Sequence, residues 1–144
     1  MNPEVIIREA QSWLATPFRA HAKVKGDGVD CVNLALAIYQ KAGILPADIV
    51  FPPYHIGSGA HLDLSAVAQF VIATRLFRLA TAPFKTGDLL GFNLGKVIHH
   101  VGIYIERDNF VHCCQKAGVI FSRLDDPTWG KRLQAVWRPI TKAS

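Results

Sequence analysis

The spacing of apolar residues changes character once along the chain, near Pro83, and this change constrains the fold more than any other feature. Before it, apolar residues recur at helical spacing, and after it the chain consists of short β-rich runs separated by turn residues. Helices followed by strands are typical of an α+β fold in which helices pack on a small antiparallel sheet. The expected helices run from Pro3 to the Thr16-Pro17 pair, from Cys31 to Gly43 and from Asp63 to about Leu79, and the expected strands cover residues 88–93, 100–105, 110–114, 119–124 and 134–140.

The length of the chain, 144 residues, fits a single domain spanning 1–144, and half of the residues are hydrophobic, which is enough for one core. No run approaches the ~18 apolar residues of a membrane span, so stable membrane insertion is not expected. The N-terminus lacks a basic region followed by an apolar stretch, so no signal peptide is visible. We therefore expect cytoplasmic synthesis with delivery by a phage particle or a secretion machinery, or an extracellular location if a leader has been removed.

Charge and cysteine content narrow the classes of partner. The formal charge of +5 and the pI of about 9.3 either favour polyanionic partners, such as acidic cell-wall polymers, or simply keep a small protein soluble. The basic residues are scattered and lack interleaved aromatics, so no nucleic-acid partner is expected. The three cysteines include the adjacent pair Cys113 and Cys114, which argues against a disulfide framework.

Cys31 is the first candidate for chemistry. It follows the Gly-rich loop 25–30 and opens a predicted helix, with Asp30 in the capping position. The partial positive charge and free N–H groups of a helix N-terminus are expected to lower the pKa of a thiol and to bind a developing oxyanion. The alternative is a buried cysteine that packs as a small hydrophobic residue.

Two histidines on neighbouring strands are the candidate partners of this thiol. A strand positions His100 rigidly, as a general base requires, and His112 is placed to orient it. A three-residue loop between Ile105 and Asn109 would pair Gly102 with His112 and set both imidazoles on one face of the sheet, whereas a two-residue loop would set them on opposite faces. The alternative to a catalytic role is that each histidine is simply a polar residue at the rim of the sheet.

A metal site is the main rival interpretation of the same region. Five zinc-capable residues occur there: His99, His100, His112, Cys113 and Cys114. Neighbouring residues on a strand point to opposite faces, and neither a Cys-x-x-Cys nor a His-x-x-x-His spacing is present. No metal and no other cofactor is therefore expected, and Cys113 and Cys114 are expected to be one core thiol and one partly exposed thiol.

Five segments together resemble the NlpC/P60 family of papain-like cell-wall peptidases. They occur in the order of the family and are 15–19 (Ala-Thr-Pro-Phe-Arg), 28–31 (Gly-Val-Asp-Cys), 85–92 (Lys-Thr-Gly-Asp-Leu-Leu-Gly-Phe), 100–105 (His-Val-Gly-Ile-Tyr-Ile) and 110–112 (Phe-Val-His). The resemblance implies helices packed on a five- or six-stranded antiparallel sheet. It also implies Cys31 as nucleophile, His100 as its base and His112 as the residue that orients the base, with no cofactor.

The substrate implied by this resemblance is a peptidoglycan stem peptide, contacted by Phe18, Arg19, Asp30 and Val32. Many members have Tyr at the position of Phe18 and Ser at that of Val32, and these groups, with the Asp, hold the free amine of the peptide; only Asp30 is retained. The long loop 45–60 and the missing leader are more similar to the phage-tail and gene-transfer-agent branch. Two alternatives stay open: a catalytically idle wall-binding or phage-tail structural module, and a hydrolase of the same mechanism acting on a non-wall amide or thioester.

Overall fold

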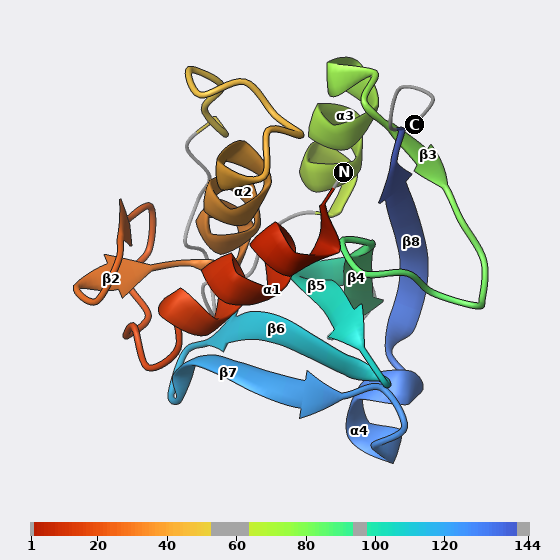
Figure 1. Ribbon diagram of the computed structural model, residues 1–144. Helices are drawn as coiled ribbons and strands as arrows, with labels where there is room; N and C mark the ends of the chain where they lie inside the picture. Colours follow the sequence, from red (N-terminus) through yellow and green to blue (C-terminus); the bar gives the residue numbers. More distant parts are fainter. Residues whose placement is uncertain (1, 53–63, 94–97, 141–144) are drawn as a thin grey trace.

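The computed structural model of the protein describes residues 2–52, 64–93 and 98–140. Its centre is a six-stranded antiparallel sheet with the strand order β3-β8-β4-β5-β6-β7. The longest helices lie together on one side of this sheet, and a short helix lies at the opposite end of the molecule (Figure 1). This confirms the predicted α+β fold with helices packed on an antiparallel sheet.

Side chains at the helix N-termini explain where the helices begin. The described helices are α1 (Pro3–Ser12), α2 (Cys31–Lys41), α3 (Leu64–Thr74) and α4 (Pro127–Gly130). The carboxylate of Asp30 accepts a hydrogen bond of 2.8 Å from the backbone N–H of Asn33, and Asn2 accepts one of 3.0 Å from Glu4. Each bond satisfies a donor that has no partner within its helix, so the caps set the first residues of α1 and α2.

The strands of the main sheet follow the predicted runs closely. They are β3 (Phe77–Leu79), β4 (Leu89–Asn93), β5 (Ile98–Glu106), β6 (Asn109–Cys114), β7 (Gly118–Arg123) and β8 (Leu133–Pro139), and a two-stranded ribbon of β1 (Lys23–Val24) and β2 (Gly28–Val29) lies apart from them. The ribbon, β3 and α4 were not predicted, because two- to four-residue elements carry too little periodicity to be recognised.

Side-chain alternation divides the sheet into two faces. On the helix side, residues such as Val101, Ile103 and Val111 join α1 and α2 in the main core. On the other side, Leu90, Phe92, Tyr104, Phe110 and Val136 form a second cluster, against which Trp129 of α4 packs. The even positions 100–104 of β5 and 110–114 of β6, which include both candidate histidines, therefore share the face of the second cluster.

The predicted helix from Asp63 to Leu79 is wrong at its C-terminal end. The helix ends at Thr74 because Arg75 has a left-handed backbone conformation, with φ of 59°. Phe77–Leu79 then forms β3 by pairing with the last strand, β8. The start at Asp63 and residues 53–60 of the loop 45–60 lie outside the described residues. No helix among the described residues is long and apolar enough to cross a membrane.

Candidate active site

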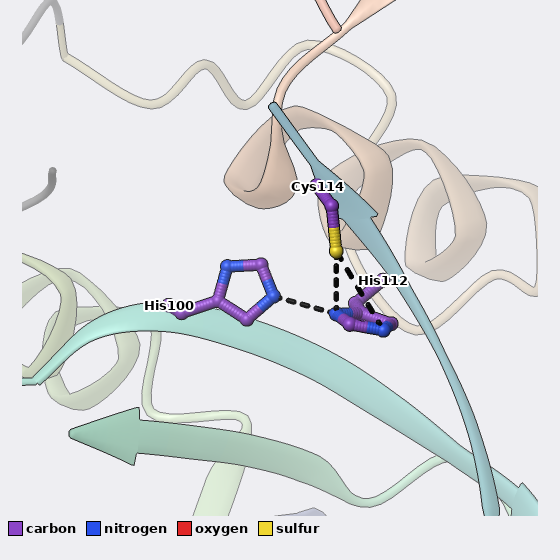
Figure 2. A group of neighbouring side chains, drawn as sticks. All are labelled: His100, His112 and Cys114. Carbon is purple, nitrogen blue, oxygen red and sulfur yellow. Dashed lines mark hydrogen bonds between the residues drawn. The ribbon is translucent and has the colours of Figure 1, made fainter. Parts of the chain in front are cut away.

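The β5–β6 hairpin brings the two histidines together. Gly102 pairs with His112, so His100 lies diagonally across the hairpin from His112 on the same face. Their rings meet edge to face, and Nε2 of His100 lies 2.7 Å from Nδ1 of His112, a hydrogen-bonding distance (Figure 2). The predicted pairing of these two side chains is confirmed.

The turn that produces this register is the two-residue alternative, which by itself would set the two imidazoles on opposite faces. Glu106 pairs with Asn109, so the turn consists of only Arg107 and Asp108, which have φ angles of 52° and 64°. Positive φ at both positions is typical of a two-residue type I′ turn. The register shifts between Tyr104 and Glu106, and this β-bulge supplies the extra residue that a three-residue loop would have contained. The histidines therefore share a face despite the shorter turn.

Gly102 makes the close approach of the two strands possible. A Cβ atom at this position would lie 2.8 Å from the carbonyl oxygen of Val111, 2.9 Å from the ring of Phe110 and 3.3 Å from Cβ of His112. The first contact is with backbone, which cannot move without breaking the ladder. Glycine at position 102 therefore allows β6 to lie close enough to β5 for His112 to contact His100.

A serine and a tryptophan that the sequence did not single out complete the histidine pair. Nε2 of His112 lies 2.7 Å from Oγ of Ser122 on β7, so both ring nitrogens of this buried imidazole have partners. The Trp129 ring lies 4.7 Å from the ring of His112 and 5.4 Å from that of His100, measured between centroids. Ser122 could have been found from the strand register, since it shares the face of His112, whereas α4 gave no sequence signal for Trp129.

The environment of His112 keeps its imidazole neutral. Burial, followed by the neighbouring His100, lowers the pKa of His112 to about 3. A neutral imidazole has one N–H donor and one acceptor nitrogen. If His112 donates to Ser122, its Nδ1 accepts a hydrogen bond from Nε2–H of His100.

Cys31 lies at the start of α2, beside the strand that carries His100. The backbone N–H groups of Val101 and Val32 interact with its sulfur, and Val101 directly follows His100. Burial, with added repulsion from the Asp30 carboxylate, nevertheless raises the pKa of the Cys31 thiol to about 12. The first-turn N–H of Val32 does lower this pKa, as expected, but the loss of hydration at Cys31, a residue only 8 % exposed, outweighs it.

Asp30 is fully occupied in shaping the turn before Cys31. One carboxylate oxygen caps α2 at Asn33, and the other accepts a hydrogen bond of 2.8 Å from the backbone N–H of His21. The residue is 1 % exposed. The predicted capping role is confirmed, and the predicted contact of Asp30 with substrate stays a prediction.

The other predicted substrate residues lie on two different segments. Phe18 is half-buried against the main core and bridges Val29, and the exposed Arg19 places Nη1 3.4 Å from the carboxylate of Asp27. Val32 is buried on α2, where it lines an apolar pocket between α2, α3 and the sheet. Their substrate contacts stay predictions.

Cys113 and Cys114 point to opposite faces of β6, as predicted. The Cys113 thiol is buried in the main core and donates to the carbonyl of Val29 at 3.3 Å. The half-exposed Cys114 shares the histidine face, with Sγ 3.5 Å from Nδ1 of His112 (Figure 2). Ligand atoms of His100, His112 and Cys114 all lie within 4.8 Å of one another. The side chain of His99 lies outside the described residues.

Comparison with known proteins agrees with this geometry. A profile of the NlpC/P60 family matches residues 15–138. The chain is 41 % identical over 138 residues to "Murein DD-endopeptidase MepS/Murein LD-carboxypeptidase" of Escherichia coli (strain K12), an alignment that covers 96 % of this chain and 63 % of that protein. This chain thus spans less than two thirds of the length of that relative.

Solved structures show the same fold at lower identity. A crystal structure of an NlpC/P60 family protein from Bacillus cereus ATCC 10987 superposes with a TM-score of 0.69 at 21 % identity, covering 98 % of this chain and 41 % of that one. RipD of Mycobacterium tuberculosis, described as a non-catalytic NlpC/p60 domain protein, gives a TM-score of 0.58 at 14 % identity, covering 96 % and 97 % of the two chains. None of these three proteins is described as a phage-tail component, so that expectation stays a prediction. The chain belongs to the NlpC/P60 family.

Proposed function

We propose that this chain is a cysteine peptidase that hydrolyses amide bonds in the stem peptides of peptidoglycan. The observation that carries the proposal is the row of hydrogen-bonding contacts from His100 to His112 to Ser122, 2.7 Å at each step, on a sheet whose strands β5 and β6 pack against the helix that begins at Cys31. The substrate class is supported by the E. coli relative, whose name describes a murein endopeptidase.

The proposed mechanism starts from a neutral thiol. Because burial raises the pKa of Cys31 to about 12, a standing thiolate–imidazolium pair is disfavoured in the free protein. His100 instead takes the thiol proton on Nδ1 as the sulfur attacks the amide carbonyl. The tetrahedral adduct then expels the amine, which takes the proton from His100 as the C–N bond breaks, and the acyl group stays on Cys31 as a thioester that water hydrolyses.

His112 supports this step as a neutral acceptor. When His100 becomes an imidazolium, its Nε2–H donates to Nδ1 of His112, and a hydrogen bond from a charged donor is the stronger kind. The pKa of His112, about 3, keeps this acceptor free of a competing proton at neutral pH. Packing of Trp129 against both rings limits the access of water to this bond, which strengthens it further.

The oxyanion is expected to lie at the N-terminus of α2. The backbone N–H of Cys31 is the first of that helix and has no intrahelical acceptor. A donor in this position, aligned with the helix dipole, stabilises the negative charge that develops on the carbonyl oxygen.

The substrate site differs from the amine-binding site that the resemblance implies. The two oxygens of Asp30 are already bonded to the backbone of His21 and Asn33, and Phe18 and Val32 offer no hydroxyl. A site with this composition is poorly suited to a free peptide amine. We therefore propose that the chain accepts internal bonds of the stem peptide or its cross-link, as an endopeptidase does.

Digestion of defined, cross-linked muropeptides, followed by mass spectrometry of the products, tests the proposal. Wild type and Cys113→Ala, which removes a thiol on the opposite face of β6, should release cleaved stem peptides, whereas Cys31→Ala should release none while remaining folded by circular dichroism. Cleavage by Cys31→Ala would refute the assigned nucleophile. Tight binding of muropeptides without cleavage by wild type would instead support an idle wall-binding module, similar in role to the non-catalytic RipD.

A further inference from the structure

Three side chains on the histidine face form a cluster of metal-binding type, which we name the thiol–imidazole cluster: His100, His112 and Cys114. We propose that this cluster binds a single Zn²⁺ or similar transition-metal dication, and that the bound ion blocks the base function of His100. The binding is independent of the proposed peptidase activity, whereas the block rests on it.

The spacing of the three ligand atoms is close to that of a tetrahedral zinc site. Bond lengths of about 2.0–2.1 Å to nitrogen and about 2.3 Å to sulfur place tetrahedral ligands roughly 3.3 Å apart for two nitrogens and roughly 3.6 Å apart for nitrogen and sulfur. The distance from Cys114 Sγ to His112 Nδ1 is 3.5 Å, and that between the two ring nitrogens is 2.7 Å. To admit the ion, the two ring nitrogens would separate by about half an ångström, and the ligand atoms of His100 and Cys114, which lie no more than 4.8 Å apart, would settle at roughly 3.6 Å.

The protons and donor atoms of the thiol–imidazole cluster also suit a bound dication. The facing ring nitrogens share one proton, and a metal ion placed between them would replace it. Cys114 would lose its thiol proton to solvent, and the single ring proton of His100 would sit on Nδ1. The product would hold a dication between two neutral imidazoles and one thiolate, a soft donor set that suits zinc.

A second observation points to a ligand at this place. Metal-bound histidines usually bond through their other ring nitrogen to an oxygen that fixes the ring, and Nε2 of His112 makes such a contact with Ser122 Oγ at 2.7 Å. The half-exposed thiol of Cys114 gives the ion a route from solvent, while His112 is fully buried. Water would complete the fourth position.

The block of catalysis follows from the ring nitrogens of His100. In the proposed mechanism Nε2 faces His112 and Nδ1 accepts the proton of Cys31. A metal ion on Nε2 forces the ring proton onto Nδ1, which then has no lone pair with which to accept a proton. The zinc-bound protein is therefore expected to be inactive as a peptidase.

Calorimetric titration of the reduced protein with ZnCl₂ tests the binding. Wild type, Cys31→Ala and Cys113→Ala should each bind one ion. Cys114→Ser should bind zinc at least about 100-fold more weakly. Loss of a residue that only supports a metal ligand lowers metal affinity ~10–100-fold, and loss of a ligand itself should lower it more. Titration with CoCl₂ should give a thiolate-to-cobalt absorption band in wild type that Cys114→Ser lacks. Equal zinc affinity of wild type and Cys114→Ser, or no stoichiometric binding, would overturn the proposal.

The activity measurement separates this inference from the proposed function. Muropeptide cleavage is followed against zinc concentration, and each variant is compared with its own zinc-free rate. Inhibition of wild type at the concentrations that saturate the calorimetric site, shifted at least about 100-fold upward in Cys114→Ser, supports the block. Stoichiometric binding by a protein that cleaves nothing refutes the peptidase alone, and full activity at saturating zinc refutes the block alone.

Discussion

Replacement of His112 by glutamine is predicted to remove a large part of the acid sensitivity of the fold. The pKa of His112 is about 3 in the folded chain and close to 6.5 when unfolded. The unfolded state therefore binds the proton first as the pH falls, and folding stability is lost progressively below pH 6.5, down to about 3. Over the whole range the loss is about 5 kcal/mol, and between pH 7.5 and 4.5 it is about 3 kcal/mol.

Urea unfolding at pH 7.5 and 4.5 measures this difference. Wild type should lose about 3 kcal/mol more stability between the two pH values than His112→Gln, whatever the absolute stability of the variant. Ser122→Ala is the matched control, because it removes a partner of the imidazole but leaves the ring buried, and it should keep most of the acid sensitivity. An identical loss in wild type and His112→Gln would refute a buried, neutral His112.

Three further predictions follow from burial and close contact. Iodoacetamide at pH 7 should label the half-exposed Cys114 faster than the buried Cys31, and peptide mass spectrometry measures the two labelling rates. Faster labelling of Cys31 would indicate a thiolate and contradict the raised pKa of Cys31. Gly102→Ala should lower the free energy of unfolding by about 1–3 kcal/mol in urea, because its methyl group would meet the backbone of β6; a neutral effect would contradict the close approach. Asp88→Asn should lower stability by about 3–5 kcal/mol, because it breaks the pair with Arg138 at a fully buried carboxylate, and a loss below about 1 kcal/mol in urea would show that the pair contributes little.

Local patterns predicted the elements that position the site. The change in apolar spacing near Pro83 separated the helices from the strands, and Asp30 before Cys31 identified the cap of α2. Alternation along β6 assigned Cys113 to the core and Cys114 to the other face, which the structure confirms. These features depend on residues close in sequence, so one sequence is enough to read them.

Features that depend on tertiary contacts could not be predicted. The bulge at Ile105 compensates for the short turn at 107–108, and turn residues alone do not reveal it. The raised pKa of Cys31 comes from burial by distant segments, which outweighs the local effect of the helix N-terminus. The metal-ligand spacings considered were those of adjacent residues and of helices. His112 and Cys114 are two positions apart on a strand and share a face with His100, which neither kind of spacing reveals.

The most direct test of the central claim is to trap the acyl intermediate. The protein is mixed with a cross-linked muropeptide and quenched in acid during turnover, and peptide mass spectrometry then locates any added acyl group. We predict a thioester on Cys31 in wild type, none on Cys113 or Cys114, and loss of the adduct in His100→Ala. Turnover that proceeds with no acyl group on Cys31, or an adduct that forms as fast in His100→Ala as in wild type, would contradict the account.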